Sequence, residues 1–171
     1  VAKKRGITQT EVLAEWKQTA DEAIQKGNQA HLFGELYPFN RGLRPQSQYD
    51  IAIMKFWSDL PEYIIPVTME LQMYHIEKMY AGTADIILYN TKTNRYILGD
   101  YKTNGDLFKN FKGQKLTGRF NHLLDTPLNK YQIQLSYYQI LLEQTEVEVS
   151  HRKVIWLLPD GTYKIYECED L

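Results

Sequence analysis

Two aspartates and a lysine near the middle of the chain are of the types used in metal-dependent hydrolysis. Asp85 lies early in the segment 83–89, Asp100 lies late in the segment 95–101, and Lys102 follows two residues later. Both segments are rich in β-branched and aromatic residues, and a polar turn separates them. The pattern therefore predicts a β-hairpin with one acid on each strand.

The pairing of this hairpin decides whether the two acids meet. If Tyr89 pairs with Tyr96, Asp85 lies directly opposite Asp100, and Lys102 shares a face with Asp100 because side chains alternate along a strand. Like charges directly opposite each other destabilise a sheet, so the two carboxylates need a cation between them, or one must hold a proton. A purely structural hairpin has little need of this arrangement, whereas a metal-dependent hydrolase uses it.

A third acid precedes the hairpin at the same spacing. Glu70, Asp85 and Asp100 are separated by equal steps of 15 residues, and Glu70 lies in another strand-like segment. One allowed antiparallel register, with Tyr74 opposite Ala81, brings the three carboxylates into a row across one sheet face. A slip of one residue would turn the side chains to the other face, so this register is a hypothesis.

Helical segments precede these strands. Thr8 fits the first position of a capping box before an amphipathic stretch that reaches Gly27. Gly27 either ends that helix or permits close packing within it. A second helical stretch, 28–37, places His31 and Glu35 four residues apart on one face.

The pattern as a whole predicts an α/β fold, with a central mixed β-sheet flanked by helices. We expect one domain over residues 1–171, with an N-terminal helical part over about 8–60 and a sheet and helix over about 62–171. The remaining expected elements are a loop over 38–48, a helix over 49–60, strands over 63–74, 147–158 and 162–167, and a helix over 128–144.

Composition restricts the functional classes. The chain has 171 residues, 43% hydrophobic and 24% charged, which is ordinary for a globular domain. Its net charge of −1 means that any binding of nucleic acid depends on local patches. No apolar run is long enough for a transmembrane helix and no secretory signal core is visible, so we expect a cytoplasmic protein without membrane partners. The single cysteine, Cys168, excludes an internal disulfide and any all-cysteine metal site.

Four short segments together resemble the PD-(D/E)XK nuclease superfamily, in particular its RecB-like branch. The Asp-x-Lys signature alone is common by chance, but the four segments occur in the order typical of the branch. They are KGNQAH (26–31), similar to its helical histidine motif; GTAD (82–85), similar to its aspartate strand; GDYKTN (99–104), similar to its Asp-x-Lys signature; and QLSYY (134–138), similar to its Gln-x-x-x-Tyr helix.

The resemblance implies a restriction-endonuclease-like core and hydrolysis of phosphodiester bonds with Mg²⁺ or Mn²⁺, bound as one or two ions. The catalytic residues that it implies are Glu70, Asp85, Asp100 and Lys102, with Lys102 positioning the attacking water. The metal ligands that it implies are His31, Glu70, Asp85, Asp100 and the carbonyl of Tyr101. Relatives with an iron–sulfur cluster have four cysteines near these motifs, so the lone cysteine implies that this cluster is absent.

Positively charged and aromatic residues outside this set predict contact with DNA. The segment 103–129 is long and basic, and its phenylalanines could stack on bases while its cations neutralise phosphate. A run of this kind is also commonly a solvated loop. The predicted nucleic-acid contacts are Arg41, Arg44, Lys109, Lys112, Lys115 and Arg119, together with Gln134 and Tyr138, which the resemblance places near the substrate but which could simply pack in a helix.

Each candidate also has a structural interpretation. The two aspartates could be solvated acids at strand ends with the lysine as their surface partner. His31 alone could be a hydrogen-bonded core histidine, and Glu70 competes with Glu77 and Glu35 for the third acidic position. The four motifs together favour the functional interpretation.

The leading hypothesis is a metal-dependent DNA nuclease, an exonuclease used in recombination, repair or phage DNA processing, in the host cytoplasm if phage-encoded. No helicase motif is visible, so a helicase or a strand-annealing recombination protein would be a separate partner. A second hypothesis is a non-catalytic nucleic-acid-binding or assembly module on a nuclease-like fold, although such a module does not need the acids and the lysine. A third retains the fold and changes the substrate to RNA or branched DNA.

Overall fold

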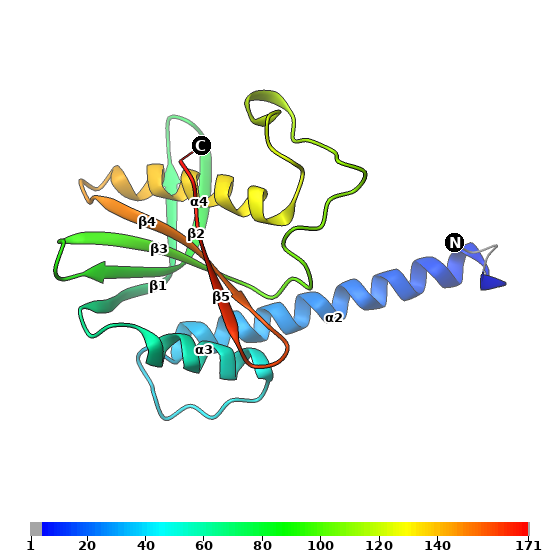
Figure 1. Cartoon of the computed structure of the whole chain (residues 1–171), viewed down its shortest axis with the longest axis horizontal. Helices are drawn as coiled ribbons and strands as arrows, with labels where there is room; N and C mark the ends of the chain where they lie inside the picture. The colour runs from blue at the N-terminus through cyan, green and yellow to red at the C-terminus, as the bar shows by residue number, and fades with distance from the viewer. Residues whose placement is uncertain (1–4, 171) are drawn as a thin grey trace.

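In the computed structural model, which describes residues 5–170, a five-stranded mixed sheet has helices on both of its faces (Figure 1). This confirms the predicted mixed α/β fold with a central sheet flanked by helices. Within residues 5–170, no helix is both long and apolar enough to cross a membrane. The elements are α2 (Gln9–Leu36), α3 (Gln48–Asp59), β1 (Ile64–His75), β2 (Tyr80–Asn90), β3 (Arg95–Lys102), the short 3₁₀ helix η1 (Gly118–Phe120), α4 (Pro127–Glu143), β4 (Val149–Leu157) and β5 (Tyr163–Glu167).

The strands follow one another across the sheet in chain order, from β1 to β5. The first three form an antiparallel meander, β4 runs parallel to β3, and β5 returns antiparallel to β4. A parallel neighbour requires a long crossover connection, which the loop after β3 and helix α4 supply. Pro66 lies at an irregularity of the edge strand β1, where a proline without an N–H is tolerated.

Both registers expected from the sequence are present. Tyr89 pairs with Tyr96 across β2 and β3, and Tyr74 pairs with Ala81 across β1 and β2. The hairpins therefore bring the three candidate acids, one on each strand, to the same end of the sheet.

The side chains of β1 and β2 change from one face of the sheet to the other near Glu70. Met69 and its partner Ile86 belong to the core shared with α2 and α3, but Leu71 and its partner Ala84, two residues away, belong with the core under α4. In a regular ladder these two pairs would lie on the same face. Glu70 lies between them with a φ of 51°, a left-handed conformation that is uncommon for a residue other than glycine. This local twist redirects the side chains of that row.

Two apolar layers hold the helices on the sheet. The core on one face contains Ile53, Phe56 and Trp57 of α3. The core on the other face contains Leu135 and Leu141 of α4. Burial on both faces explains why the central strands are almost continuously apolar rather than alternating.

Helix α2 is continuous and extends beyond the sheet. Thr8 and Glu11 form the predicted capping box, and the helix then runs through Gly27 without a break. A Cβ at Gly27 would lie 3.6 Å from Thr103 Oγ1, which is an ordinary contact, so the glycine neither ends the helix nor is needed for close packing. The C-terminal half covers the sheet, while the N-terminal half projects away from it (Figure 1).

Candidate metal centre

The packed half of α2 brings His31 to the end of the sheet. Ala30 and Phe33 anchor this half of the helix in the core. A Cβ at Gly34 would lie 2.5 Å from the ring of Tyr101, so glycine is required where the helix meets β3. The close approach leaves the imidazole of His31 in edge-to-face contact with the same ring, at a centroid distance of 6.3 Å.

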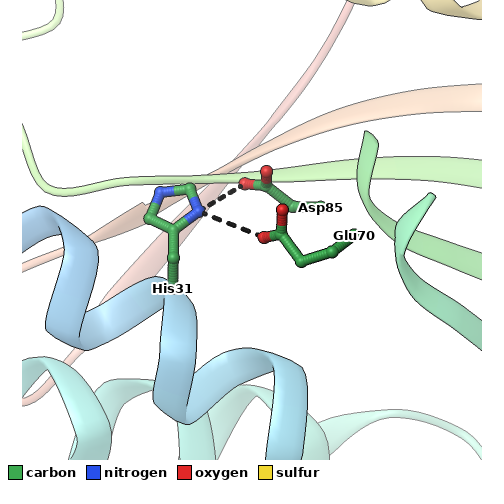
Figure 2. Close-up of side chains that lie close together, drawn as sticks. All are labelled: His31, Glu70 and Asp85. Atoms are coloured by element: carbon green, nitrogen blue, oxygen red, sulfur yellow. Dashed lines mark ion pairs between the residues drawn. The ribbon is translucent and has the colours of Figure 1, made fainter. Parts of the chain in front are cut away.

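His31, Glu70 and Asp85 converge on one point (Figure 2). The distance from His31 Nδ1 is 3.2 Å to Asp85 Oδ2 and 3.7 Å to Glu70 Oε1. One nitrogen or oxygen atom from each residue lies within 4.8 Å of the other two. The three residues come from α2, β1 and β2, so the full fold is needed to assemble them.

The structure selects Glu70 from the competing glutamates. Glu77 lies exposed in the turn after β1, away from this group. Glu35 borders the hollow that also contains His31 and Glu70, but it lies outside the convergent group. Burial and the charge of Asp85 raise the pKa of Glu70. The left-handed backbone conformation of Glu70 costs of order 1–3 kcal/mol of strain energy. Strain of this kind is concentrated at functional sites.

Asp85 is buried and is held ionised by its neighbours. Burial opposes its charge, but the hydrogen bond and charge of His31, with the charge of Lys102, hold the pKa of Asp85 below its usual range. The backbone N–H of Tyr101 donates to Asp85 Oδ2 at 2.8 Å. The Tyr101 carbonyl belongs to the same residue, and its role as a metal ligand stays a prediction.

Asp100 lies beside this group but outside it. Its side chain is 2% exposed, and its Oδ2 lies 2.5 Å from Lys102 Nζ. Within the described part of the chain, however, that oxygen has no partner in hydrogen-bonding geometry. Burial and the charge of Asp85 raise the pKa of Asp100 to about 7, against the opposing effect of Lys102. The predicted row of three carboxylates is thus divided, because Asp100 turns towards Lys102 while the other two turn towards His31.

Lys102 contacts Tyr131 of α4, a residue that the sequence analysis did not identify. The Nζ atom lies 4.5 Å from the centroid of the Tyr131 ring, and the Tyr131 hydroxyl donates to Asn104 Oδ1 at 2.9 Å. Burial opposes protonation of Lys102, but the charges of Asp100 and Asp85 raise its pKa. The sequence feature that could have identified Tyr131 is its position one turn before Gln134 on the same helix.

Gln134 and Tyr138 lie on α4 facing β2. Gln134 Nε2 donates to the Tyr138 hydroxyl at 2.6 Å. A Cβ at Gly82 would lie only 2.1 Å from the Tyr138 ring, so the ring packs directly on the backbone of the strand that leads to Asp85. The pair therefore stabilises one wall of the site, and a direct contact with substrate remains a prediction.

The loop between β3 and α4 is ordered by its own hydrogen bonds. The Asn110 side-chain amide donates to the carbonyls of Gln114 and Asp125, and Arg119 donates to the Tyr137 hydroxyl at 2.9 Å. The four predicted DNA-contacting cations of the loop, Lys109, Lys112, Lys115 and Arg119, are all exposed. Phe111 is 65% exposed beside them, which suits stacking on a base.

Arg41 and Arg44 lie in the loop between α2 and α3. Arg41 stacks over Tyr37 and Trp57, at 4.8 and 5.3 Å from the ring centroids. Arg44 borders a hollow beside α2, with Leu32 and Asp50. Neither arginine contacts the convergent group, so their role in binding phosphate stays a prediction.

The donor set suits a divalent cation. The carboxylates of Glu70 and Asp85, which face each other at these distances, need a positive charge between them. Carboxylate and carbonyl oxygens are the ligands that Mg²⁺ prefers, and one imidazole nitrogen makes Mn²⁺ equally suitable. The residues present therefore fit such an ion.

The assignment of a function depends on this geometry. With the whole sequence as the query, no protein-family model matches and no curated protein matches. The resemblance to PD-(D/E)XK nucleases accordingly remains a hypothesis carried by the four motifs and by the positions of their residues.

Proposed function

We propose that this protein is a metal-dependent nuclease of the PD-(D/E)XK type that hydrolyses phosphodiester bonds in DNA, with a restriction-endonuclease-like core. One observation carries the proposal. His31, Glu70 and Asp85 converge beside a buried pair, Asp100 and Lys102, at the end of the same sheet.

The ion would be held by His31, Glu70 and Asp85, with Asp100 and the Tyr101 carbonyl completing its ligands. When bound, Mg²⁺ or Mn²⁺ would lower the pKa of a water molecule and neutralise charge on the phosphate. The protein has no cysteine set for an iron–sulfur cluster, since Cys168 is its single cysteine.

Lys102 would orient the attacking water and stabilise negative charge that develops on the phosphoryl oxygens. Asp100 and the face of Tyr131 fix its ammonium group, so a positive charge is already in place before substrate binds. A preorganised charge in a buried site needs no rearrangement during the reaction, which is the condition for efficient electrostatic stabilisation.

The basic loop would bind the DNA backbone. It begins directly after Lys102 and ends at α4, which contains Tyr131, so both ends of the loop adjoin the site. Its exposed cations can neutralise phosphates, and Phe111 can stack on an unpaired base. This local patch compensates for a net charge of −1, which provides no general attraction to DNA.

The electrostatics favour catalysis over a purely binding role. Burying two aspartates beside a half-exposed glutamate at one end of a sheet is costly unless a cation joins them. A binding module on the same fold would be more stable with neutral residues at these positions. Retention of the acids together with Lys102 therefore supports the enzyme.

A direct test uses end-labelled linear DNA, closed circular DNA and RNA, each with Mg²⁺ and with Mn²⁺. We expect degradation of DNA, which Asp100→Ala and Lys102→Ala abolish. Glu62→Ala and Lys55→Ala are matched controls, because both residues are exposed and remote from the group. Sparing of circles would identify an exonuclease. Folded protein that cleaves none of the substrates with either ion would overturn the proposal.

We also propose a cytoplasmic setting in recombination, repair or phage DNA processing. A nuclease without a motor would depend on a separate helicase, or on a strand-annealing protein that takes up the processed strand. Pull-down with tagged protein, with and without DNA ends, tests for such partners.

A further inference from the structure

The side chain of Tyr101 lies where the sheet meets both α2 and α3. The residue is 1% exposed and belongs to the core that the sheet shares with these two helices. It stands between Asp100 and Lys102 on β3, and side chains alternate along a strand, so its ring points away from theirs. The resemblance implies a role only for the backbone carbonyl of Tyr101, which leaves the position of its ring to be explained.

The Tyr101 ring contacts α2 at two positions that lie one turn apart. Its centroid is 6.3 Å from that of the His31 imidazole, and the two planes meet at 89°. A Cβ at Gly34 would lie 2.5 Å from the ring, so the helix backbone lies directly against it. Residues three apart share one side of a helix. The ring therefore sets both the approach of α2 to the sheet and the surroundings of the imidazole.

The hydroxyl end of the same ring is anchored to α3. Trp57 Nε1 donates a hydrogen bond to the Tyr101 hydroxyl at 2.8 Å, and Trp57 is itself buried. A buried donor that loses its acceptor is costly, so this bond favours one position of the ring. Phe56 also packs edge-to-face on the ring, at a centroid distance of 6.1 Å. The position of the ring is thus fixed from α3 while its other side faces α2.

The backbone of Tyr101 holds another member of the convergent group. Its N–H donates to Asp85 Oδ2 at 2.8 Å. Asp85 comes from β2 and His31 from α2. Tyr101 therefore contacts two of the three convergent residues through different groups, one through its backbone and the other through its ring.

A histidine that binds a metal normally needs a second contact that fixes the orientation of its ring, most often a hydrogen bond to its other nitrogen. His31 directs Nδ1 at Asp85 and Glu70 (Figure 2). The contact that the structure provides beside this imidazole is the perpendicular ring of Tyr101. An aromatic ring that is itself held in place can fix an imidazole by packing.

We propose that Tyr101 is a positioning residue of the metal centre, whose ring, anchored by Trp57, holds the His31 imidazole in the orientation that binds the ion. The inference rests on the proposed metal-dependent function and adds two aromatic side chains to it. Both act through His31 and touch no reacting atom. Loss of contacts that orient a metal ligand lowers metal affinity by about 10–100-fold.

Tyr101→Phe tests the proposal, because it keeps the ring and removes the hydroxyl that Trp57 anchors. Titration with Mn²⁺, followed by electron paramagnetic resonance, measures the Kd of the ion without following cleavage. We expect the Kd to rise about tenfold or more. The matched control is Tyr163→Phe, which should leave the Kd unchanged. The Tyr163 hydroxyl donates to Asp59 at 2.9 Å, and its ring packs on Phe56 in the same core.

Coupling of Mn²⁺ to nitrogen separates the positioning of His31 from a general loss of stability. At saturating Mn²⁺, the electron spin echo of the unmodified protein should show coupling to one imidazole nitrogen, and His31→Ala should remove it. In Tyr101→Phe this coupling should weaken while the ion stays bound by the carboxylates. Undiminished coupling would overturn the proposal whether or not the Kd changes, because the imidazole would then still be directed at the ion.

Trp57→Phe tests the same hydrogen bond from α3, and it serves if Tyr101→Phe folds poorly. It removes the Nε1 donor and should raise the Kd for Mn²⁺ to a similar extent. The two single variants and the double variant all remove one hydrogen bond, so their effects on the Kd should not add. Additive effects would show that the two residues act on the site independently, which would contradict an anchored ring.

Gly34→Ala tests the contact between the ring and α2. The new Cβ would meet the ring and displace it from the helix, so we expect a higher Kd and weaker nitrogen coupling. Gly27→Ala is the matched control on the same helix, because its Cβ would make only an ordinary contact, at 3.6 Å from Thr103 Oγ1. Equal effects of the two substitutions would assign the change to the helix and overturn the role of the ring.

The unmodified protein distinguishes failure of this inference from failure of the proposed function. If it binds no Mn²⁺, the proposed function fails and the inference fails with it. If it binds Mn²⁺ without nitrogen coupling, the acids remain a metal site but His31 is not a ligand, and the inference is overturned alone. If it shows the coupling and Tyr101→Phe behaves identically, only the positioning role is refuted.

Discussion

His31 Nδ1 lies 3.2 Å from Asp85 Oδ2, and this contact joins helix α2 to the central sheet. Burial opposes protonation of His31, but the hydrogen bond and charge of Asp85 raise its pKa above the usual value. In metal-free protein at pH values below this raised pKa, a proton on His31 provides positive charge beside the acids. A divalent ion at the same place would displace that proton, so binding of the ion and pH are linked.

The first prediction follows from the direction of these pKa shifts. His31 with a raised pKa stabilises the folded chain at pH values below its unfolded pKa, and this contribution is lost as pH rises through the folded pKa. Asp100, raised to about 7, keeps its proton in the folded state while the unfolded state ionises, so stability falls from about pH 4 to about pH 7.

We therefore expect the Tm of metal-free protein to fall between about pH 5 and about pH 8. Mn²⁺ binds the deprotonated ligands, so the rise in Tm that it causes should grow over the same range. Thermal unfolding in EDTA and in excess Mn²⁺ measures both effects. If Mn²⁺ raised the Tm equally at the two ends of the pH range, the linkage would be contradicted. His31→Ala should reduce the pH dependence of the Mn²⁺-induced rise in Tm.

The second prediction concerns Asp100→Asn. The substitution removes a buried carboxyl group whose pKa is raised to about 7, and it retains the shape of the side chain. Because the raised pKa means that the ionised Asp100 carboxylate destabilises the folded state, we expect metal-free protein at about pH 8 to become more stable by about 1–3 kcal/mol while cleavage is lost. Denaturant unfolding in EDTA measures the change, with Glu62→Gln as the exposed control. A loss of stability would show that the pair with Lys102 outweighs the burial of the charge.

The third prediction separates metal binding from catalysis at Lys102. Its ammonium contacts Asp100 and the Tyr131 ring but is not part of the convergent ligand group. Lys102→Gln should therefore retain a rise in Tm with Mn²⁺ and lower kcat by about 10²–10³-fold. Loss of the Mn²⁺ effect would instead assign Lys102 a role in maintaining the ligand geometry.

Much of this arrangement could be predicted from the sequence because it depends on local pattern. The polar turn between β2 and β3 indicates the register, and the register brings Asp85 near Asp100 and Glu70 near Asp85. His31 could be located because helical periodicity and its short motif coincide. The capping box at Thr8 marks the beginning of α2 in the same way.

The remainder depends on tertiary structure. Nothing in the sequence indicates that Glu70 adopts a φ of 51°, which exchanges the faces of the sheet and separates Asp100 from the other two acids. The continuity of α2 through Gly27 was left open because glycine is weakly unfavourable in a helix but does not forbid it. The contact of Tyr131 with Lys102 joins α4 to β3, and such long-range pairs have no sequence period.

The fourth prediction concerns the basic loop. Lys109, Lys112 and Lys115 are exposed, so their replacement by glutamine should leave stability nearly unchanged. If each contacts one phosphate, the triple variant should bind DNA more weakly and lower the slope of log K against log salt by about 2–3. Fluorescence anisotropy at several salt concentrations, with Asp100→Ala present to prevent cleavage, measures the slope. The control is Lys92→Gln, in the turn after β2, where Lys92 stacks on Tyr63. An unchanged slope would remove the loop from the DNA-binding surface.

The fifth prediction tests the wall that Tyr138 forms on β2. A Cβ at Gly82 would lie 2.1 Å from the Tyr138 ring, so Gly82→Ala must displace the ring and should cost about 1–3 kcal/mol of unfolding free energy. Gly105→Ala is the matched control, because nothing lies within 4 Å of its Cβ position.

A double-mutant cycle shows whether the two positions act through this contact. Tyr138→Ala removes the ring that Gly82→Ala would strike, so adding Gly82→Ala to Tyr138→Ala should cost much less than Gly82→Ala does alone. Additive costs would show that the strand, and not the ring, is disturbed. The Tyr138 hydroxyl accepts the hydrogen bond from Gln134 Nε2, so displacement of the ring also frees the Gln134 side-chain amide. DNA cleavage by Gly82→Ala should therefore fall to the level of Gln134→Ala if the pair contacts substrate, and should follow stability alone if the pair only packs.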